Sequence, residues 1–401
     1  MAARFWAFGP VASCGWLAGL VEREPGRSVA SRPTSLLAAV VPDEDVAAAP
    51  AEGGELALGL DSVLDPVVET HAVREKTSVA SCKKRQQMDI MILMETLYIT
   101  HPSFRLHEMG EWHPECPQRL DAISDQLLSS GIAPYLNEEQ AVQPVCRQAL
   151  ERVHQSDYLD RLEAMAPIDG YSTIDPDTMM NPHTLEAARL AAGAVVMAVD
   201  AVMRAQASTA FCAVRPPGHH ATPNQAMGFC FYNNVAVAAA HAMETYGLKR
   251  IALIDFDVHH GNGTEAIFAG DERVLMCSFY QHPLFPNAQI EPMPPNMVNI
   301  PVPAYTSGAD IREVVRQHWL PRLEAHQPEL VFISAGFDAH REDDMGQLGL
   351  VESDYAWMTQ QVVAIADRHA QGRVVSALEG GYHLSALARS VIAHIRALAK
   401  I

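Results

Sequence analysis

One short segment, residues 251–264 with the sequence IALIDFDVHHGNGT, joins an apolar run to residue types that bind metals. The aliphatic residues are followed at once by Asp255, Asp257, His259 and His260. Buried parallel strands carry functional side chains just beyond their carboxyl ends. Because residues two apart on a strand share a face, Asp255, Asp257 and His259 are expected on one side. Such a cluster indicates a metal or acid–base site rather than a merely charged strand end.

Three more expected strands run into polar residues of the same kind: 211–215 into His219 and His220, 330–336 into Asp338, and 374–380 into Tyr382. The carboxyl ends of parallel strands meet along one edge, so we expect these side chains to converge. A catalytic zinc ion takes three nitrogen or oxygen ligands and keeps one position open. Asp257, His259 and Asp338 would supply such a set.

The elements that must position these residues alternate between strand and helix from residue 96 onward. Strands are expected at 96–101, 211–215, 251–256, 274–279, 298–302, 330–336 and 374–380; helices are expected from about 117, over 145–165, 182–205, 235–246, 308–325 and 353–370, and from 385. This alternation predicts an α/β fold with a mainly parallel sheet covered on both faces, a three-layer αβα arrangement. Without a repeat or clear linker, residues 94–401 are expected to form one domain.

Residues 1–93 differ in texture, with many Ala, Val, Pro, Gly and Glu residues and no sustained hydrophobic period. The first twenty residues loosely resemble a signal peptide, but Gly, Pro and Ser interrupt their apolar region. We expect a disordered extension, or an upstream stretch translated from a wrongly assigned start. A chain beginning at Met94 is expected to fold and act normally.

Composition excludes several classes of function. The formal net charge of −19 disfavours nucleic-acid binding, which needs a basic surface. The 48% hydrophobic and 19% charged residues are typical of a soluble globular protein. The sequence contains no uninterrupted apolar run of about 18 residues, so no membrane-spanning helix is expected. The 7 cysteines are odd in number and lack Cys-x-x-Cys spacing, which fits a reducing, cytoplasmic location and no thiolate metal site.

Five motifs, in order, resemble those of the histone deacetylase superfamily: RPPGHHA (215–221), GFCFYNNVA (228–236), DFDVHHGNGT (255–264), SAGFDAH (334–340) and EGGYH (379–383). HPECPQRL (113–120) is similar to the amino-terminal motif of that family. The resemblance covers about residues 96–398, and HHGNG looks closest to the class II branch and its bacterial relatives. It implies an arginase/deacetylase fold and zinc-dependent removal of an acyl group from an amine.

The resemblance also implies the catalytic machinery. It implies zinc binding by Asp257, His259 and Asp338, and catalytic roles for His219, His220, Tyr382, Asp255 and Asn262. Asp255 would orient His219, and Asn262 would stand beside His220. We expect His220 to be the general base because Asn262 gives it no carboxylate partner, whereas His219 is better placed to stay cationic. The reverse assignment stays open.

The chemistry of amide hydrolysis agrees with these roles. Zinc can polarise the amide carbonyl and bring the pKa of a water towards about 7. A histidine can take the proton of that water and later return one to the departing amine. Tyr382, after a Gly-Gly hinge, can donate a hydrogen bond to the developing oxyanion.

Further sites follow from the resemblance. It implies an inner monovalent-cation site, usually for potassium, at Asp255, Asp257, Ser278 and the carbonyls of His259 and Phe279. It implies substrate contacts at Asp177 on the rim, Gly228, Phe229 and Phe285 along the acyl-lysine tunnel, Met345 at its mouth, and Arg119 beside an internal cavity. The expected substrate is an acyl-lysine peptide or a small acyl-amine. Relatives often pair or form tetramers, which leaves a homo-oligomer open.

Three alternatives are weaker. An arginase-type dimanganese hydrolase needs further carboxylates that the stretches 257–261 and 338–340 lack. A non-catalytic binding relative of the fold would be expected to lose Tyr382 or a metal ligand. An acetylpolyamine amidohydrolase would carry an acidic gatekeeper where Met345 stands, although Asp177 and the acidic balance still allow a cationic substrate.

Overall fold

A single sheet of parallel strands organises the protein. The structure, a computed structural model, describes residues 96–288 and 291–401; the expected extension over residues 1–93 and the domain start at Met94 lie outside them. The strands are β1 (Thr96–Ile99), β2 (Leu136–Glu139), β5 (Thr209–Cys212), β6 (Ile251–Asp255), β7 (Val274–Gln281), β8 (Met297–Val302), β9 (Leu330–Ala335) and β10 (Val374–Leu378). Their order in the 8-stranded sheet is β2-β1-β5-β10-β9-β6-β7-β8, and every neighbouring pair is parallel.

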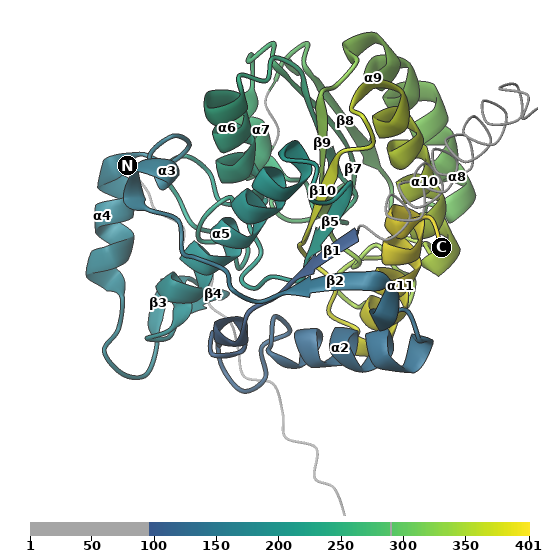
Figure 1. The fold of residues 1–401 in the computed structure, drawn as a ribbon. Helices are drawn as coiled ribbons and strands as arrows, with labels where there is room; N and C mark the ends of the chain where they lie inside the picture. Colours follow the sequence, from purple (N-terminus) through teal and green to yellow (C-terminus); the bar gives the residue numbers. More distant parts are fainter. Residues whose placement is uncertain (1–95, 289–290) are drawn as a thin grey trace, which may run out of the picture. The chain divides into compact units, whose positions relative to one another are not determined.

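Helices cover both faces of this sheet (Figure 1). They are α2 (Gln118–Ser130), α3 (Arg147–Leu150), α4 (Ser156–Met165), α5 (Thr184–Met203), α6 (Asn234–Tyr246), α7 (Asn262–Phe268), α8 (Gly308–Val314), α9 (Leu320–His326), α10 (Glu352–His369) and α11 (Leu384–Ala399). Helices α5 and α6 pack together on one face, and α10 and α11 pack together on the other, with α2 against α11. The predicted three-layer αβα domain with a mainly parallel sheet is therefore confirmed. Within the residues described, no helix is both long and apolar enough to cross a membrane.

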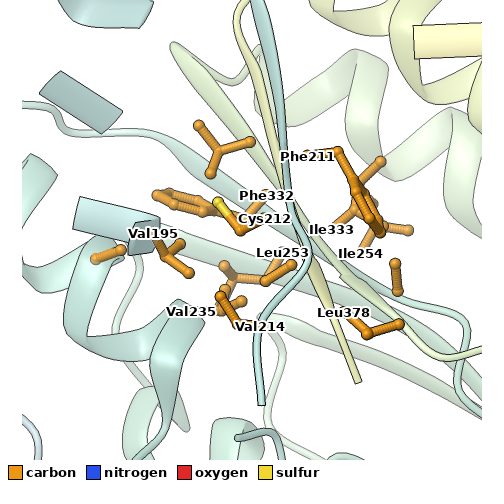
Figure 2. Close-up of a cluster of buried hydrophobic side chains, with 14 of the residues drawn as sticks. Val195, Phe211, Cys212, Val214, Val235, Leu253, Ile254, Phe332, Ile333 and Leu378 are labelled. Carbon is orange, nitrogen blue, oxygen red and sulfur yellow. The ribbon is translucent and has the colours of Figure 1, made fainter. Parts of the chain in front are cut away.

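Successive residues of β5 face opposite helical layers. The thiol of Cys212 donates to the carbonyl of Ala194 in α5 (3.6 Å), whereas the ring of Phe211 meets that of His394 in α11, with 5.6 Å between centroids. Figure 2 shows the same division, with Cys212 on the side of Val195 and Phe211 on the other. Because both faces of the central strands are buried, these strands read as continuous apolar runs in the sequence.

Two expected helices are interrupted. The one over residues 145–165 is divided into α3 and α4, because the N–H of Gln155 donates to the carbonyl of Pro223 (2.7 Å) rather than within a helix. The one over residues 308–325 contains a π-helical turn, Val315–Trp319, between α8 and α9. The sequence pattern also does not predict β2, whose residues Leu-Asn-Glu-Glu are partly exposed, the small hairpin of β3 (Ser172–Asp175) and β4 (Thr178–Met180), or the short helix α7.

Candidate active site

Four neighbouring strands carry the residues that the sequence singles out. Strands β5, β10, β9 and β6 stand side by side in the sheet, and their carboxyl ends lie along one edge because all are parallel. Each is followed by one part of the predicted cluster: His219 and His220 after β5, Tyr382 after β10, Asp338 after β9, and Asp257 and His259 after β6. Strand topology therefore brings together residues from across more than half of the described chain.

The chain bends immediately after β6, so the expected strand geometry for Asp257 and His259 is wrong. Strand β6 ends at Asp255. Its carboxylate then accepts the N–H of Asp257 (3.1 Å), and the carboxylate of Asp257 accepts the N–H of His259 (2.9 Å). Each aspartate thus closes a turn on the backbone two residues ahead, as Asp side chains commonly do. These turns, rather than the pleat of a strand, direct the two side chains.

Asp257, His259 and Asp338 form a buried group that could hold a metal ion. Their donor atoms all lie within 4.8 Å of one another, and no other group of three or more His, Cys, Asp or Glu residues meets this criterion among the described residues. His259 Nδ1 lies 3.0 Å from Asp257 Oδ1 and 3.2 Å from Asp338 Oδ2. Ligands of a tetrahedral zinc ion at about 2.0–2.2 Å from the metal lie roughly 3.4 Å apart.

Two further observations test whether a metal fits this group. Asp338 Oδ2 is buried and accepts no hydrogen bond, so it keeps its lone pairs for another partner. A Cβ atom at Gly380 would lie 2.1 Å from that oxygen and 2.5 Å from Asp257 Oδ2, so only glycine leaves the carboxylates their space. The residues present therefore suit a metal ion with nitrogen and oxygen ligands.

The electrostatics of Asp257, His259 and Asp338 also favour binding of a cation. Burial raises the pKa of Asp338, and the charge of Asp257 adds to the effect, which brings that pKa to about 7. Burial opposes protonation of His259, yet the nearby carboxylates of Asp257 and Asp338 prevail and raise its pKa to about 10. Two buried carboxylates thus favour positive charge between them, which a bound divalent cation would supply.

The adjacent histidines differ in their partners. His219 Nδ1 lies 3.0 Å from Asp255 Oδ2, and His220 Nδ1 lies 2.8 Å from Asn262 Oδ1. Burial opposes charge on His219, but the carboxylates of Asp257 and Asp255 outweigh it and hold its pKa well above the usual value. Burial and the positive charges of His219 and His259 instead hold the pKa of His220 well below it. The pair therefore offers one cationic and one neutral imidazole.

A narrow cavity leads to these groups. It has a volume of about 90 Å³ and is lined by Asp177, His220, Gly228, Phe229, His259, Phe285, Met345 and Tyr382. The rings of Phe229 and Tyr382 meet nearly at right angles, with 5.8 Å between centroids. The carbonyl of Asp177 lies 3.0 Å from His113 Nε2, and burial together with Asp175 raises the pKa of the Asp177 carboxyl. Every residue expected along the tunnel or its rim thus lines one cavity.

Arg119 lies behind the cavity rather than in its wall. It is fully buried, its guanidinium stands 5.0 Å from the centre of the Tyr382 ring, and its Nε donates to the carbonyl of Gly381 (2.7 Å). Its Nη1 also donates to Glu115 (3.0 Å). Arg119 therefore supports the loop that carries Tyr382.

The residues expected to bind potassium are divided between β6 with the loop after it, which carry Asp255, Asp257 and His259, and the neighbouring strand β7, which carries Ser278 and Phe279. Asp255 stands opposite Ser278 in the register of β6 and β7. The hydroxyl of Ser278 donates to Asn299 (2.9 Å), and its carbonyl accepts the indole N–H of Trp319 (3.2 Å). Burial, with the charge of Asp257 adding to it, raises the pKa of Asp255.

Several buried charged residues at this edge are assigned no chemistry by the sequence patterns. Glu379 accepts the N–H groups of Gly218 (2.6 Å) and His219 (3.1 Å), and burial raises its pKa to about 7. Glu115 pairs with Arg119 and with Arg215. Glu115, Arg215 and Glu379 all lie within the motifs quoted above. Their position in those motifs is the sequence feature that could have identified them as part of the site.

Comparisons with known proteins identify similar sequences and a similar fold. The family model for the histone deacetylase domain matches residues 113–398. A histone deacetylase-like amidohydrolase of Pseudomonas aeruginosa is 37% identical over 277 residues, which cover 67% of this chain and 72% of that protein. A polyamine deacetylase of Mus musculus, HDAC10, is 37% identical over 308 residues, which cover 71% of this chain and 44% of that protein. The crystal structure of the HDA15 HD domain matches with a TM-score of 0.71 at 33% identity and covers 76% of this chain and 90% of that chain.

Proposed function

Because this chain belongs to the histone deacetylase family, we propose that it is a zinc-dependent deacetylase that removes an acetyl or other acyl group from an acyl-lysine side chain or a related acyl-amine. One observation carries the proposal. A single narrow cavity is lined by His220, His259 and Tyr382 together, so a metal ligand, an uncharged imidazole and a phenol border the same space. Hydrolysis of an amide needs a Lewis acid, a base and an oxyanion donor within reach of one carbonyl.

Asp257, His259 and Asp338 would hold the zinc ion. When bound, zinc supplies a Lewis acid that polarises the acyl carbonyl and lowers the pKa of a water molecule. Two observations support this assignment. Asp338 Oδ2 is buried without a hydrogen-bond donor, and His259 Nδ1 lies close to both carboxylates.

His220 would act as the general base. Its pKa is held well below the usual value, chiefly by burial, so its imidazole is neutral at pH 7 and can accept a proton from water. His219 would keep a positive charge beside the reacting group, because Asp255 and Asp257 raise its pKa. The imidazolium formed on His220 can then return its proton to the departing amine.

Tyr382 would stabilise the negative charge that develops on the carbonyl oxygen. Burial raises the pKa of its phenol well above the usual value, so the group keeps the proton that it must donate. Its ring lines the cavity together with Phe229, His220 and His259. The phenol therefore complements the imidazoles as a donor rather than as a base.

The cavity favours acyl-lysine or another acyl-amine over an acetylpolyamine. Phe229, Phe285 and Met345 supply apolar walls, and Asp177 supplies a carboxylate on the rim for the backbone of a peptide or for a cation. The methionine at position 345 offers no carboxylate that could pair with the second ammonium group of a polyamine. The similarity to a protein named polyamine deacetylase makes acetylpolyamines the alternative substrate class.

Other functions of the fold fit less well. A dimanganese hydrolase would need a second ligand group, and the described residues contain the one group of Asp257, His259 and Asp338. A non-catalytic relative has no use for a neutral His220 and a protonated Tyr382 bordering one cavity.

We also propose a potassium ion at Asp255, Asp257, Ser278 and the carbonyls of His259 and Phe279. The pairing of Asp255 with Ser278 between β6 and β7 supports this site. We further propose a cytoplasmic location.

Substrate competition tests the proposal. The value of kcat/KM is measured for an acetyl-lysine peptide, a longer-chain acyl-lysine peptide and acetylputrescine, with the wild type and with Met345→Glu. We expect the wild type to prefer an acyl-lysine and the variant to shift towards acetylputrescine, because the new carboxylate can pair with the distal ammonium. A wild type that prefers acetylputrescine would reverse the choice of substrate. No hydrolysis of any acyl-amine by the zinc-loaded protein would refute the enzymatic function.

A further inference from the structure

One peptide group next to Tyr382 is held by ions of opposite sign at its two ends. The carbonyl of Gly381 accepts a hydrogen bond from Arg119 Nε (2.7 Å), and the N–H of Tyr382 donates to Asp343 Oδ2 (2.6 Å). Arg119 and Asp343 are both buried. The unit that carries the Tyr382 side chain is therefore fixed from both sides by charged groups.

The arrangement matches the dipole of the peptide. A peptide oxygen is partially negative and its N–H partially positive, so a guanidinium at the oxygen and a carboxylate at the N–H are both favourable. Hydrogen bonds to ionised groups are shorter and stronger than those between neutral groups. Gly381 has φ = 113°, a conformation that residues other than glycine rarely adopt, so the turn that leads into Tyr382 favours glycine here.

Asp343 also connects this loop to the wall of the tunnel. The same oxygen, Oδ2, accepts the N–H of His383 (2.9 Å), and Oδ1 accepts the N–H of Met345 (3.0 Å). Met345 and Tyr382 both line the cavity, whereas Asp343 does not. A single buried carboxylate thus sets the position of two cavity residues whose loops come from β9 and β10.

We propose that Asp343 is a positioning residue that fixes the direction of the Tyr382 phenol relative to the zinc ligands and Met345. It acts through backbone N–H groups and touches neither the substrate nor the metal. The inference rests on the proposed role of Tyr382 as oxyanion donor. A shift of about 1 Å in a group that acts in the transition state can cost on the order of 100-fold in rate.

Asp343→Asn is the informative substitution because it keeps the shape of the side chain. An amide has one accepting oxygen, so at least one of the N–H groups of Met345, Tyr382 and His383 would face an NH₂ donor. The exposed neighbour Asp344 provides the matched control, Asp344→Asn, with the same change of charge on the same loop.

A double-mutant cycle separates positioning from general damage. Asp343→Asn and Asp344→Asn are made in the wild type and in Tyr382→Phe, and kcat, KM, zinc content and thermal midpoint are measured for the full chain. We expect Asp343→Asn to lower kcat roughly 10- to 100-fold with zinc retained, Asp344→Asn to leave kcat unchanged, and Asp343→Asn to change the rate of Tyr382→Phe by no more than about twofold.

The outcomes are distinguishable. An equal loss of kcat in both backgrounds overturns the inference, because Asp343 would then act independently of Tyr382. Near-normal turnover of Tyr382→Phe alone refutes the role of Tyr382 in the proposed function instead. If Asp343→Asn does not fold, Asp343→Glu repeats the cycle with the charge kept, and a variant with normal thermal midpoint and wild-type kcat despite the longer side chain would also overturn the inference.

Discussion

Nδ1 of His220 lies 2.8 Å from the side-chain oxygen of Asn262, an uncharged partner, whereas its neighbour His219 faces the carboxylate of Asp255 at 3.0 Å. The two rings lie close, with 4.0 Å between centroids, so they share one electrostatic environment. Their different partners therefore decide which ring carries the positive charge. Like charges at this separation disfavour double protonation, which keeps His220 neutral while His219 is charged.

Replacing Asn262 with Asp should move the pH dependence of catalysis. A carboxylate at this distance favours the imidazolium form and raises the pKa of His220, which burial and the charges of His219 and His259 otherwise hold low. A base works only when deprotonated, so activity falls as pH decreases through its pKa. Raising that pKa should move the acidic limb of kcat/KM to higher pH by roughly one to three units. An unmoved acidic limb would assign the base to His219 instead.

Tyr382→Phe should lose turnover while keeping the metal. Removing one oxyanion donor typically costs about 2.7–4 kcal/mol, or roughly 100- to 1000-fold in kcat. Zinc content should remain that of the wild type, because the three expected ligands are elsewhere. Tyr305→Phe, at a tyrosine that is 78% exposed, serves as the control and should be fully active. Turnover of Tyr382→Phe within a few-fold of the wild type would remove this tyrosine from the mechanism.

Asp257→Asn and His259→Ala should each lose the metal itself. Each change removes one of three closely spaced donors, and elemental analysis should show well under one zinc ion per chain. Tyr382→Phe is the matched control that retains zinc. Removal of zinc from the wild type with a chelator should lower the thermal midpoint, because Asp257 and Asp338 then lack their counter-cation. Full zinc occupancy in both ligand variants would place the metal elsewhere.

The sequence predicts this site better than it predicts the supports of the site. Buried parallel strands are apolar on both faces, so the strands and the residues that follow them stand out as patterns. Asp343 has no such pattern. It contacts the backbone N–H of Tyr382, 39 residues away, and almost any residue type could supply that N–H, so the sequence does not reveal the pairing. The bends after Asp255 are likewise hidden, since Asp-x-Asp-x-His is compatible with a strand until the carboxylates accept backbone N–H groups.

His154 should make the folded protein sensitive to acid. It is buried, Nε2 accepts the N–H of Asn233 (3.0 Å), and Nδ1 lies 2.9 Å from the carbonyl of Thr222, an arrangement that needs the neutral ring. Burial lowers its pKa to about 4, below the unperturbed value of 6.5. The unfolded chain therefore binds this proton first as pH falls, and stability present above pH 6.5 is lost down to about pH 4, up to ~3 kcal/mol.

Chemical denaturation at pH 7 and pH 5 measures this effect. His154→Gln should show a smaller loss of unfolding free energy between the two pH values than the wild type. His183→Gln, at an exposed histidine, should keep the wild-type difference. Identical pH dependence in wild type and His154→Gln would show that protonation of this residue does not drive the acid sensitivity.

Gly228→Ala should block the tunnel. Gly131→Ala is the control that separates the effect of crowding from that of backbone strain. Gly228 has φ = 54°, and a Cβ there would lie 2.5 Å from the ring of His220 and 2.9 Å from that of Phe285. Gly131 has φ = 70°, yet its Cβ would meet nothing within 4 Å. Both alanine variants should lose stability, since both force alanine into a left-handed conformation, and Gly228→Ala should lose more because of the added crowding. Only Gly228→Ala should lower kcat/KM, by about 100-fold or more, because His220 must move away from Asn262. Thermal midpoints and kcat/KM for an acetyl-lysine peptide test both statements, and equal activity of the two variants would mean that the cavity tolerates the added methyl group.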